Sequence, residues 1–500
     1  MVKSIISWFN ANIGFPTGSS GSRSAVSKCD TVSFHGMEKR NRPTIDGQRN
    51  AFRNRPTQNA NDPFMDINWI DEFVRRIKPF IYVRDEDNLL ILIPNQAYNL
   101  NPSAVAILSF LLGGNPVRRL LQEVGDEPEK RREIHHFFCD LRALVSGCLR
   151  DQEKRAAVTY KEFRGDTNRL PVLSEIAVTY RCNLKCEFCY VGRHDSAELG
   201  SADIKKLLFK IVREARIPSV SFTGGEPLLR ADIVELVRYA RQAGLWTNLI
   251  TNGTMMGQKL VDRLKSAGLS SCQVSIEGPT PDIHDRITGQ PGSFDKTVAA
   301  LARLQAVGIP VHTNTTVSRS NLEHLENIVT LAARLGLPRL SMNLMIPCGS
   351  AADRRDLWVS YTEIGPLLLH LKRTADQSRI KFLWYSPVPV CHFNPVAHGF
   401  GNKSCAAVTG LLSIDPEGNI IPCSSWREPV GSLLTSSFKS IWHSGILPYF
   451  HHAEYAPSAC RSCVRFDLCK GACPLYWRAV DGQPGLDAAD AVNPVRSGRN

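Results

Sequence analysis

Three cysteines lie close together in the run from Arg181 to Tyr190, at the spacing C-x3-C-x2-C. They are Cys182, Cys186 and Cys189, and the aromatic residue Tyr190 directly follows the last of them. Cysteine thiolates hold iron–sulfur clusters, whose chemistry depends on ligand number and surroundings. Three thiolates on a four-iron cluster leave the fourth iron open to a substrate or cosubstrate. This run therefore indicates redox chemistry.

A second motif, Thr223-Gly-Gly-Glu-Pro227, begins about 35 residues later, directly after a predicted strand. Gly224 and Gly225 lack side chains, which predicts close approach of the backbone to a ligand. Glu226 offers an acceptor for an ammonium group, and the proline ring makes the turn rigid. Taken alone, the motif also fits an ordinary turn. Its position after the cysteine run favours a binding site.

Together the two motifs resemble those of the radical S-adenosylmethionine superfamily. The resemblance implies that Cys182, Cys186 and Cys189 hold a [4Fe-4S] cluster. The cosubstrate S-adenosylmethionine would bind the open iron, with the Gly-Gly-Glu-Pro stretch contacting its amine. One electron from the cluster would then cleave it to a 5′-deoxyadenosyl radical, while the protein positions the atoms and excludes water. A zinc site with a distant fourth ligand is the alternative.

The same resemblance assigns cosubstrate roles to residues at later strand ends. Ser275 and Asn314 are expected to bind its ribose and carboxylate. Glu277 is expected to touch the cosubstrate or the substrate, and Tyr190 to lie beside the adenine. Alternatively, each of these residues binds no ligand, and is a packing residue or a polar residue at the mouth of the barrel.

A second group of cysteines lies near the C-terminus. Cys405 is followed by Gly418 and Cys423, and then by a C-x2-C-x5-C-x3-C run. The arrangement resembles the SPASM extension, which carries two auxiliary [4Fe-4S] clusters. By that resemblance, one cluster takes Cys391, Cys405, Cys423 and Cys473, and the other takes Cys460, Cys463 and Cys469. A pair of zinc sites is the alternative.

The second auxiliary cluster lacks a fourth cysteine, because none follows Cys473 where the family usually has one. Three explanations stay open. An aspartate serves as the ligand, the cluster keeps an open iron, or the chain is a truncated gene product. The aspartates that the chain could bring to the site are Asp467, Asp481, Asp487 and Asp490.

Alternating strands and helices must position these motifs. Strands are predicted at Ser174–Val178, Ser219–Phe222, Thr247–Ile250, Ser271–Ile276, Val311–Val317 and Arg339–Met345. Helices are predicted at Ile204–Ala215, Ile233–Ala243, Lys259–Ala267, Phe294–Ala306 and Leu322–Leu335. Several of the helices stop at a glycine, as helices in β/α units commonly do. The fold class is therefore α/β, a partial (β/α)6 TIM-like barrel with its working groups at the C-terminal ends of the strands.

A small α+β domain is predicted in front of the barrel, over residues 66–150. Two strand-like runs, Phe80–Arg84 and Leu89–Ile93, form a hairpin, and Asn101 begins the cap of a helix that ends near Leu112. This winged-helix shape resembles the pyrroloquinoline-quinone chaperone (PqqD-like) fold, called the RiPP recognition element in maturases. The resemblance implies that the domain binds a peptide leader by adding it as a strand. A packing domain without a peptide role is the alternative.

The remaining boundaries follow from composition. Residues 1–65 are expected to be a disordered basic tail or the product of a mis-called start, with nine basic against three acidic residues in the first 60. The other predicted parts are a linker at 151–171, the radical SAM core at 172–350, a connecting helical region at 351–390, the C-terminal iron–sulfur (SPASM) domain at 391–480 and a tail at 481–500. The clusters bound by the SPASM domain are expected to replace a missing hydrophobic core there.

The composition of the chain limits which cellular compartment and which binding partners are expected. The 500 residues carry a net charge of +12 and no apolar run long enough to span a membrane, and the N-terminus lacks a signal-peptide core. In so large a chain, the clustered spacing of the 15 cysteines indicates metal binding and not disulfides. A cytoplasmic protein is expected, with no membrane partner, and nucleic acid is not expected as a ligand.

These observations predict a radical SAM/SPASM maturase that abstracts hydrogen from a peptide or protein to install a crosslink or an oxidation. It would need an electron donor such as ferredoxin or flavodoxin. One alternative is the maturation of a folded metalloenzyme or sulfatase. An alternative of another class is a non-catalytic iron–sulfur electron carrier or redox regulator.

Overall fold

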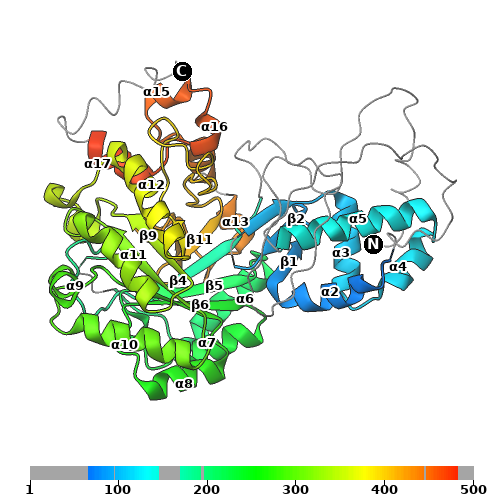
Figure 1. Ribbon diagram of the computed structural model, residues 1–500, viewed down its shortest axis with the longest axis horizontal. Coiled ribbons are helices and arrows are strands. Elements are labelled where there is room, and N and C mark those ends of the chain that lie inside the picture. The colour runs from blue at the N-terminus through cyan, green and yellow to red at the C-terminus, as the bar shows by residue number, and fades with distance from the viewer. Residues whose placement is uncertain (1–65, 95, 146–168, 193–195, 444–445, 482–500) are drawn as a thin grey trace, which may run out of the picture. The chain divides into compact units, whose positions relative to one another are not determined.

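The computed structural model of the chain describes residues 66–94, 96–145, 169–192, 196–443 and 446–481 (Figure 1). The chain divides into two compact units, Met1–Arg76 with Ala106–Leu149 and Ile77–Val105 with Arg150–Asn500. The division therefore runs through the predicted 66–150 domain. The predicted tail 1–65 and nearly all of the predicted linker and C-terminal tail lie outside the described residues.

The larger unit is built on one sheet, of which β4, β5, β6, β9 and β11 are labelled in Figure 1. The strand order in this sheet is β10-β9-β8-β7-β6-β5-β4-β11-β12-β13. Neighbouring strands from β10 to β11 pair in parallel, whereas β12 and β13 pair antiparallel. The strands are β4 (Leu173–Thr179), β5 (Ser219–Gly224), β6 (Trp246–Thr251), β7 (Ser271–Ser275), β8 (Val311–Val317), β9 (Arg339–Leu344), β10 (Lys381–Trp384), β11 (Leu411–Ile414), β12 (Asn419–Ile421) and β13 (Gly431–Ser432).

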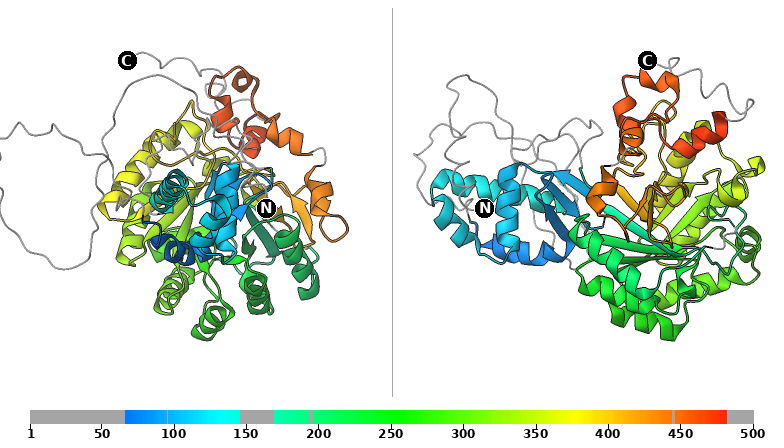
Figure 2. Two further views of the ribbon diagram at one scale, coloured as in Figure 1. Left: turned by 90° about the vertical axis from the view of Figure 1, so that its right-hand side faces the viewer. Right: turned by 180° about the vertical axis from the view of Figure 1, so that it is seen from behind.

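Helices between these strands cover the outer face of the sheet (Figure 2). They are α6 (Ser201–Arg213), α7 (Ile233–Gln242), α8 (Gln258–Ala267), α9 (Pro281–Thr288), α10 (Ser293–Ala306), α11 (Leu325–Arg334) and α12 (Tyr361–Gln377). Every strand and helix predicted for the barrel is present close to its predicted ends, so the α/β barrel prediction is confirmed. The prediction missed α9 and the strands that extend the sheet, β10 and β11.

The cysteine-rich C-terminal segment is joined to the barrel by its strands. β11 pairs with β4 and so continues the parallel sheet. Leu412, Ile414 and Ile420 belong to the same buried core as the barrel helices. The expectation that bound clusters replace a missing core is therefore wrong for this part of the segment. Its helices are α13 (Phe438–Trp442), α14 (Ile446–His451), α15 (Ser458–Arg461), α16 (Phe466–Cys469) and α17 (Pro474–Asp481).

A separate antiparallel sheet belongs to the larger unit and contains β1 (Ile81–Arg84), β2 (Leu89–Leu92) and β3 (Gln96–Asn99). The first two strands confirm the predicted hairpin, and β3 was not predicted. Arg84 is fully buried beside Asp87 and donates to the Leu170 and Pro171 carbonyls, at 2.9 and 2.7 Å. This buried guanidinium connects the hairpin to the stretch that leads into β4.

The remaining helices are α2 (Trp69–Ile77), α3 (Pro102–Leu112), α4 (Val117–Val124) and α5 (Pro128–Val145). The Asn101 side chain accepts a hydrogen bond from the Ala104 N–H at 2.7 Å, which confirms the predicted cap of α3. Phe73 and Phe138 pack edge to face between α2 and α5. The winged-helix assignment stays a prediction. No helix in the described ranges is both long and apolar enough to cross a membrane.

Candidate functional site

The motifs singled out in the sequence meet at one edge of the sheet, where the parallel strands end. The loop after β4 carries the three cysteines, and the Gly-Gly-Glu-Pro turn begins at the end of β5. β6 ends at Thr251 and β7 ends at Ser275. The carboxyl ends of parallel strands face the same way, so these loops are neighbours, as the sequence predicts for a barrel site.

The cysteine loop is held in place by segments far along the chain. The Lys185 N–H donates to the Thr288 carbonyl at the end of α9, at 2.9 Å. The Ser350 N–H, in the loop after β9, donates to the Cys189 carbonyl at 2.8 Å. A Cβ at Gly349 would lie 2.3 Å from the same carbonyl oxygen, so only glycine fits there. Sequence reasoning missed these contacts, because they join positions more than a hundred residues apart.

The three thiols of this loop lie within electrostatic reach of one another. The surrounding protein desolvates the Cys182 thiol and, with the charges of Glu226 and Cys189, raises its pKa to about 11. Burial also raises the pKa of Cys186, and the Glu277 carboxylate and the two other thiols add to the shift. The free thiols of Cys182 and Cys186 therefore keep their protons near neutral pH. Binding of iron must release those protons, since the thiolate is the metal ligand.

The two glycines of the Gly-Gly-Glu-Pro turn approach protein backbone. Gly224 has φ +133°, and a Cβ there would lie 2.0 Å from the Thr179 carbonyl oxygen. A Cβ at Gly225 would lie 2.3 Å from the Arg181 carbonyl oxygen. The Gly225 N–H donates to Thr179 O and the Glu226 N–H to Arg181 O, both at 2.8 Å. The close backbone approach that these glycines allow is made toward the start of the cysteine loop, and their approach to a ligand stays a prediction.

Glu226 is fully buried and ties β5 to β6. Its carboxylate accepts hydrogen bonds from the Leu228 N–H at 3.0 Å, the Thr251 hydroxyl at 2.7 Å and the Asn252 N–H at 2.8 Å. Burial raises its pKa to about 7 in spite of these donors. An ionised carboxylate offers about four acceptor positions, so little of its capacity is left for another donor. Contact between Glu226 and a cosubstrate amine stays a prediction.

A polar cluster next to Cys182 was not singled out from the sequence. The Asn252 amide donates to the Asn183 side chain at 2.9 Å and lies 3.9 Å from the Cys182 sulfur. Asn183 in turn donates to the Thr254 hydroxyl at 2.8 Å. The strand-end sequence Thr-Asn-Gly was the only signal in the sequence for this cluster. It orients the first cysteine of the loop.

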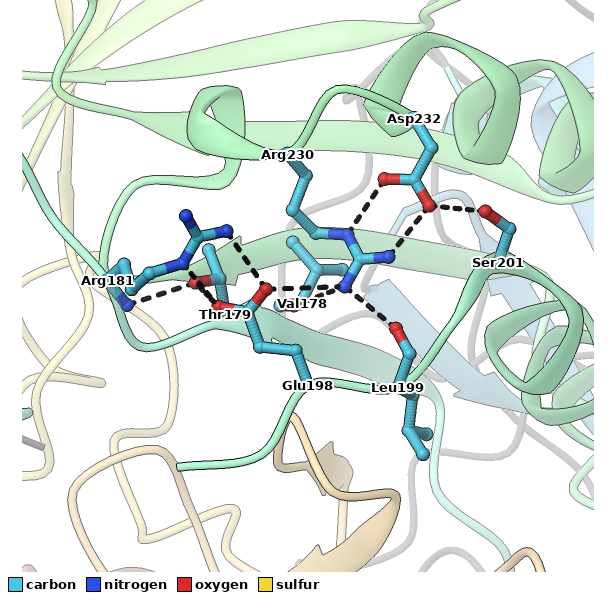
Figure 3. A network of polar contacts seen from close by, with 8 residues as sticks. All are labelled: Val178, Thr179, Arg181, Glu198, Leu199, Ser201, Arg230 and Asp232. Carbon is cyan, nitrogen blue, oxygen red and sulfur yellow. Dashed lines mark hydrogen bonds and ion pairs between the residues drawn. The ribbon is translucent and has the colours of Figure 1, made fainter. Parts of the chain in front are cut away.

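A buried arginine fastens the other side of the cysteine loop (Figure 3). Arg230, which follows the Gly-Gly-Glu-Pro turn, donates to the Val178 carbonyl at 3.1 Å and forms a bidentate pair with Asp232 at 2.7 and 2.9 Å. Arg181 forms a second bidentate pair with Glu198, at 2.8 and 3.0 Å. Paired guanidinium and carboxylate groups have a fixed planar geometry. The network therefore holds the residue that precedes Cys182.

The predicted cosubstrate residues on β7 and β8 are neighbours. Ser275 and Asn314 are register partners across the two strands. The Asn314 side chain accepts from the Ser341 hydroxyl at 2.9 Å and donates to Asn343 at 2.7 Å. Ribose and carboxylate binding by Ser275 and Asn314 stays a prediction. The Tyr190 hydroxyl donates to the Gly224 carbonyl at 3.1 Å, and its place beside an adenine also stays a prediction.

Glu277 is a buried carboxyl group just beyond β7. One oxygen accepts from the Thr316 N–H at 2.9 Å. Burial raises the pKa of Glu277 to about 8, so the group is largely protonated at neutral pH. Burial lowers the pKa of His284 to about 4, and this neutral ring accepts from the Glu277 N–H at 3.1 Å. The site therefore contains a neutral acid close to Cys186.

A row of polar side chains runs across the face of the sheet opposite the apolar core. It consists of register partners on β11, β4, β5, β6 and β7, namely Ser413, Glu175, Ser221, Asn248 and Ser271. Hydrogen bonds join Ser413 to Glu175 at 2.7 Å, and Asn248 to Ser221 and Ser271 at 3.2 and 2.8 Å. Interiors of closed barrels are usually filled by branched apolar residues. This face offers hydrogen-bonding groups instead.

The cysteines of the C-terminal segment are free thiols at two places in the fold. Cys405, Cys423 and Cys473 pack against the main core of the larger unit. Cys460, Cys463 and Cys469 lie in and between α15 and α16. Cys391, in the loop after β10, is exposed. In the described part of the chain, no group of three or more cysteine, histidine or acidic side chains is close enough to hold a single metal ion.

Comparison with known families matches both cysteine regions. Residues 176–332 match the model of the Radical SAM superfamily, and residues 405–464 match that of SPASM, an iron–sulfur cluster-binding domain. The chain is similar to a PqqA peptide cyclase of Ruegeria pomeroyi, with 30% identity over 337 residues, 65% of this chain and 87% of the relative. It is also similar to an AdoMet-dependent heme synthase of Nitratidesulfovibrio vulgaris, with 30% identity over 319 residues, 59% of this chain and 85% of the relative.

Solved structures share the fold. The structure of Streptococcus suis SuiB bound to the precursor peptide SuiA aligns with a TM-score of 0.61 and 14% identity, over 81% of this chain and 96% of that one. SuiB bound to S-adenosylmethionine aligns with a TM-score of 0.58 and 15% identity, over 80% of this chain and 96% of that one. At this identity, the similarity concerns the fold alone.

The close contact between Gly225 and the Arg181 carbonyl predicts the effect of adding one methyl group at position 225. Gly225→Ala places a Cβ against the Arg181 carbonyl, so the cysteine loop must move. We expect a loss of about 2–4 kcal/mol in the free energy of unfolding and less iron bound by this loop after anaerobic reconstitution. Gly257→Ala is the matched control, because its Cβ meets no atom within 4 Å. Equal iron content in the two variants would contradict the prediction.

The raised pKa of Glu277 predicts a dependence of stability on pH. The folded state holds this proton more tightly than the unfolded chain does, so the stabilisation is lost as the pH rises through about 8. The melting temperature of the reconstituted protein should fall by roughly 2–4 °C between pH 6.5 and 9. Glu277→Gln keeps the shape without the titration and should flatten this fall. An unchanged slope in that variant would show that another group is responsible.

Proposed function

The chain belongs to the radical SAM superfamily and carries the SPASM domain, and from this premise we propose that it modifies a peptide or protein chain by hydrogen abstraction. It is an enzyme, and it uses S-adenosylmethionine and [4Fe-4S] clusters. Because the chain belongs to this superfamily of enzymes, it is not a non-catalytic iron–sulfur electron carrier or redox regulator. The nature of the substrate and the role of each residue are proposed from the described side chains.

Cys182, Cys186 and Cys189 are proposed to hold the first cluster, because their sulfurs share one loop at the working edge of the sheet. When bound, the cluster supplies the electron that converts S-adenosylmethionine to methionine and a 5′-deoxyadenosyl radical, which takes hydrogen from the substrate. Ser275 and Asn314 are proposed to bind the cosubstrate. Backbone carbonyls of the Gly-Gly-Glu-Pro turn are proposed as acceptors for its amine, since the Glu226 carboxylate already accepts three hydrogen bonds.

The protein's own part in the reaction is to keep the loops rigid. Arg230 and Glu226 connect the ends of different strands through buried hydrogen bonds. Arg181 pairs with Glu198 at the surface, between β4 and α6. A reacting group that is held in place does not lose orientational freedom during the reaction. We propose that these three side chains position the cysteine loop and that none of them reacts.

The polar row on the face of the sheet opposite the apolar core is the observation that supports a peptide substrate. Its members are Ser413, Glu175, Ser221, Asn248 and Ser271, and hydrogen bonds join Ser413 to Glu175 and Asn248 to both Ser221 and Ser271. A peptide backbone presents an amide donor and a carbonyl acceptor in almost every residue. Heme, for which the AdoMet-dependent heme synthases are named, is a large and mostly apolar ring that would need mostly apolar walls. The polar row therefore favours a peptide of the kind that the related peptide cyclases act on.

The hairpin sheet is the proposed holder of a leader segment. β3 is an edge strand, with Gln96 and Ala97 exposed. An extended peptide adds to such an edge through main-chain hydrogen bonds. Arg84 and Asp87 connect the hairpin to the stretch before β4, so a bound leader would be held by the same unit as the barrel.

The proposed reductant is a low-potential protein of the ferredoxin or flavodoxin class. Free cysteines persist in reducing compartments, which supports a cytoplasmic location. Maturation of a folded metalloenzyme or a sulfatase remains the competing substrate hypothesis. A short peptide encoded beside the gene would favour our proposal, whereas a neighbouring gene for a large oxidoreductase would favour the competitor.

Loss of one thiolate from the cysteine loop should abolish cosubstrate cleavage. With dithionite as reductant, the reconstituted wild-type protein should release 5′-deoxyadenosine, measured by chromatography. Cys186→Ala should lower this release at least 100-fold, because the first cluster loses a ligand. Cys272→Ala is the control, since that thiol is buried in β7, among apolar core residues. Cleavage that survives in Cys186→Ala would contradict the assignment of the loop.

Binding of a leader by β3 should depend on that edge. Ala97→Pro removes an exposed N–H from an edge strand, where proline is tolerated. The full-length variant should bind a fluorescent leader peptide, taken from a small peptide encoded beside the gene, at least tenfold more weakly in anisotropy titrations. Ala97→Ser keeps the N–H and should bind as the wild type does. Equal affinity in both variants would exclude strand addition at β3.

A further inference from the structure

A short turn in the C-terminal segment, at residues 423–427, contacts both the barrel and the cysteine loop. It follows β12 and lies in the stretch that matches the SPASM model. The turn begins at Cys423, whose carbonyl accepts a hydrogen bond from the Trp426 N–H at 2.9 Å, and these two residues form an antiparallel bridge. The side chains after Cys423 reach different neighbours, so the 423–427 turn connects elements that are far apart in the chain.

Arg427, the last residue of this turn, holds the end of the cysteine loop. Its guanidinium Nη1 donates to the Val191 carbonyl at 3.0 Å, from a position 236 residues further along the chain. Val191 is 1% exposed and comes two residues after Cys189. A buried carbonyl needs a donor, and a hydrogen bond from a charged donor is roughly twice as strong as a neutral one. Arg427 therefore fixes the loop just beyond its third cysteine.

The two serines of the turn reach the segments on either side of the cysteine loop. The Ser424 hydroxyl donates to the Glu175 carboxylate on β4, the strand that leads into the loop. Ser425 lies beside Cys348 in the segment after β9. Burial raises the pKa of the Cys348 thiol to about 11, and a hydrogen bond with Ser425 opposes the rise. The same segment after β9 also holds the cysteine loop by a main-chain hydrogen bond.

Trp426 anchors the turn in the C-terminal segment. Its buried ring packs edge to face against Phe450 and Tyr449 of α14, with ring centroids 5.5 and 6.3 Å apart. The Arg478 guanidinium of α17 lies over the same ring, 4.6 Å from its centroid. These contacts hold the turn from the side away from the cysteine loop. The position of Arg427 therefore depends on how the C-terminal segment packs.

We propose that Arg427 is a positioning residue, through which the C-terminal segment sets the geometry of the cysteine loop and with it the binding of the cosubstrate. This inference rests on the proposed function, in which the loop holds the cluster that binds S-adenosylmethionine. The start and middle of the loop are held from the barrel, by main-chain hydrogen bonds of Gly225, Lys185 and Ser350. The end of the loop is held from the C-terminal segment instead.

The consequence of losing this contact follows from its place in the chain. Arg427 is not a cysteine, and Tyr190 and Val191 separate its contact from Cys189, so its loss removes no iron ligand. The loop could keep its three thiols and still present the open iron in an altered position. A misplacement of about 1 Å by a distant mutation can lower a rate by about 100-fold. The defect should therefore be weaker binding of the cosubstrate at unchanged iron content.

The experiment compares the full-length wild type with Arg427→Met, which keeps a long side chain but has no donor. Both are reconstituted anaerobically with iron and sulfide and reduced with dithionite. S-adenosylmethionine should change the electron paramagnetic resonance signal of the first cluster, because its open iron gains a ligand. The spectrum of Cys186→Ala, in which the first cluster lacks a ligand, is subtracted to remove the auxiliary signals. The measured quantity is the concentration of S-adenosylmethionine that produces half of the change.

We expect Arg427→Met to need roughly tenfold more S-adenosylmethionine than the wild type, with the same iron content. Arg427→Lys should stay within about threefold of the wild type, because its ammonium group can still donate to the Val191 carbonyl. Arg478→Met is the matched control. It removes an arginine of the same segment that contacts Trp426 and Glu428, and it should bind the cosubstrate as the wild type does.

Wild-type binding in Arg427→Met would overturn the inference, and so would Arg427→Lys that binds no better than Arg427→Met. An equal loss in Arg478→Met would also overturn it, because the effect would then come from loosening the C-terminal segment in general. If Arg427→Met does not fold, Arg427→Gln takes its place and the same comparisons decide. A wild-type signal that does not respond to S-adenosylmethionine would instead contradict the proposed function, because the loop would not hold the cosubstrate cluster.

Discussion

The close backbone contact between the end of β4 and the end of β5 is the constraint on which the rest of the site depends. Gly224 and Gly225 lie so near Thr179 and Arg181 that no Cβ fits between them. Across this contact the Gly225 N–H donates to the carbonyl of Thr179, the last residue of β4, and the Glu226 N–H donates to the carbonyl of Arg181 in the cysteine loop. The position of the cysteines is therefore set by main-chain geometry, which varies less than a contact between long side chains.

Glu226 and Arg230 are buried polar residues beside this contact, and both have partners that offset their desolvation. Glu226 accepts three hydrogen bonds, and Arg230 binds both Asp232 and the Val178 carbonyl. Removing one partner from such a group leaves a buried polar atom unpaired, which costs more than the net gain of an ordinary hydrogen bond. These groups make the loop geometry specific, because an alternative loop position would break several hydrogen bonds at once.

The auxiliary segment is positioned by the same sheet. β11 pairs in parallel with β4, the strand that leads into the cysteine loop. The Ser413 hydroxyl on β11 donates to Glu175 on β4, so the polar row continues from the barrel into the C-terminal segment. Two cysteine-rich regions that are more than two hundred residues apart in the chain are thus joined through one sheet.

The sequence by itself determined the elements of the barrel and the cysteine loop, because periodicity, capping residues and ligand spacing are local properties of the chain. Motifs at strand ends had to meet, since parallel strands end at one edge of a sheet. The tertiary structure alone decided what Gly224 and Gly225 contact, and that the Glu226 carboxylate accepts hydrogen bonds from Thr251 and Asn252. These depend on which distant loops pack together, and one-dimensional spacing carries no information about such packing.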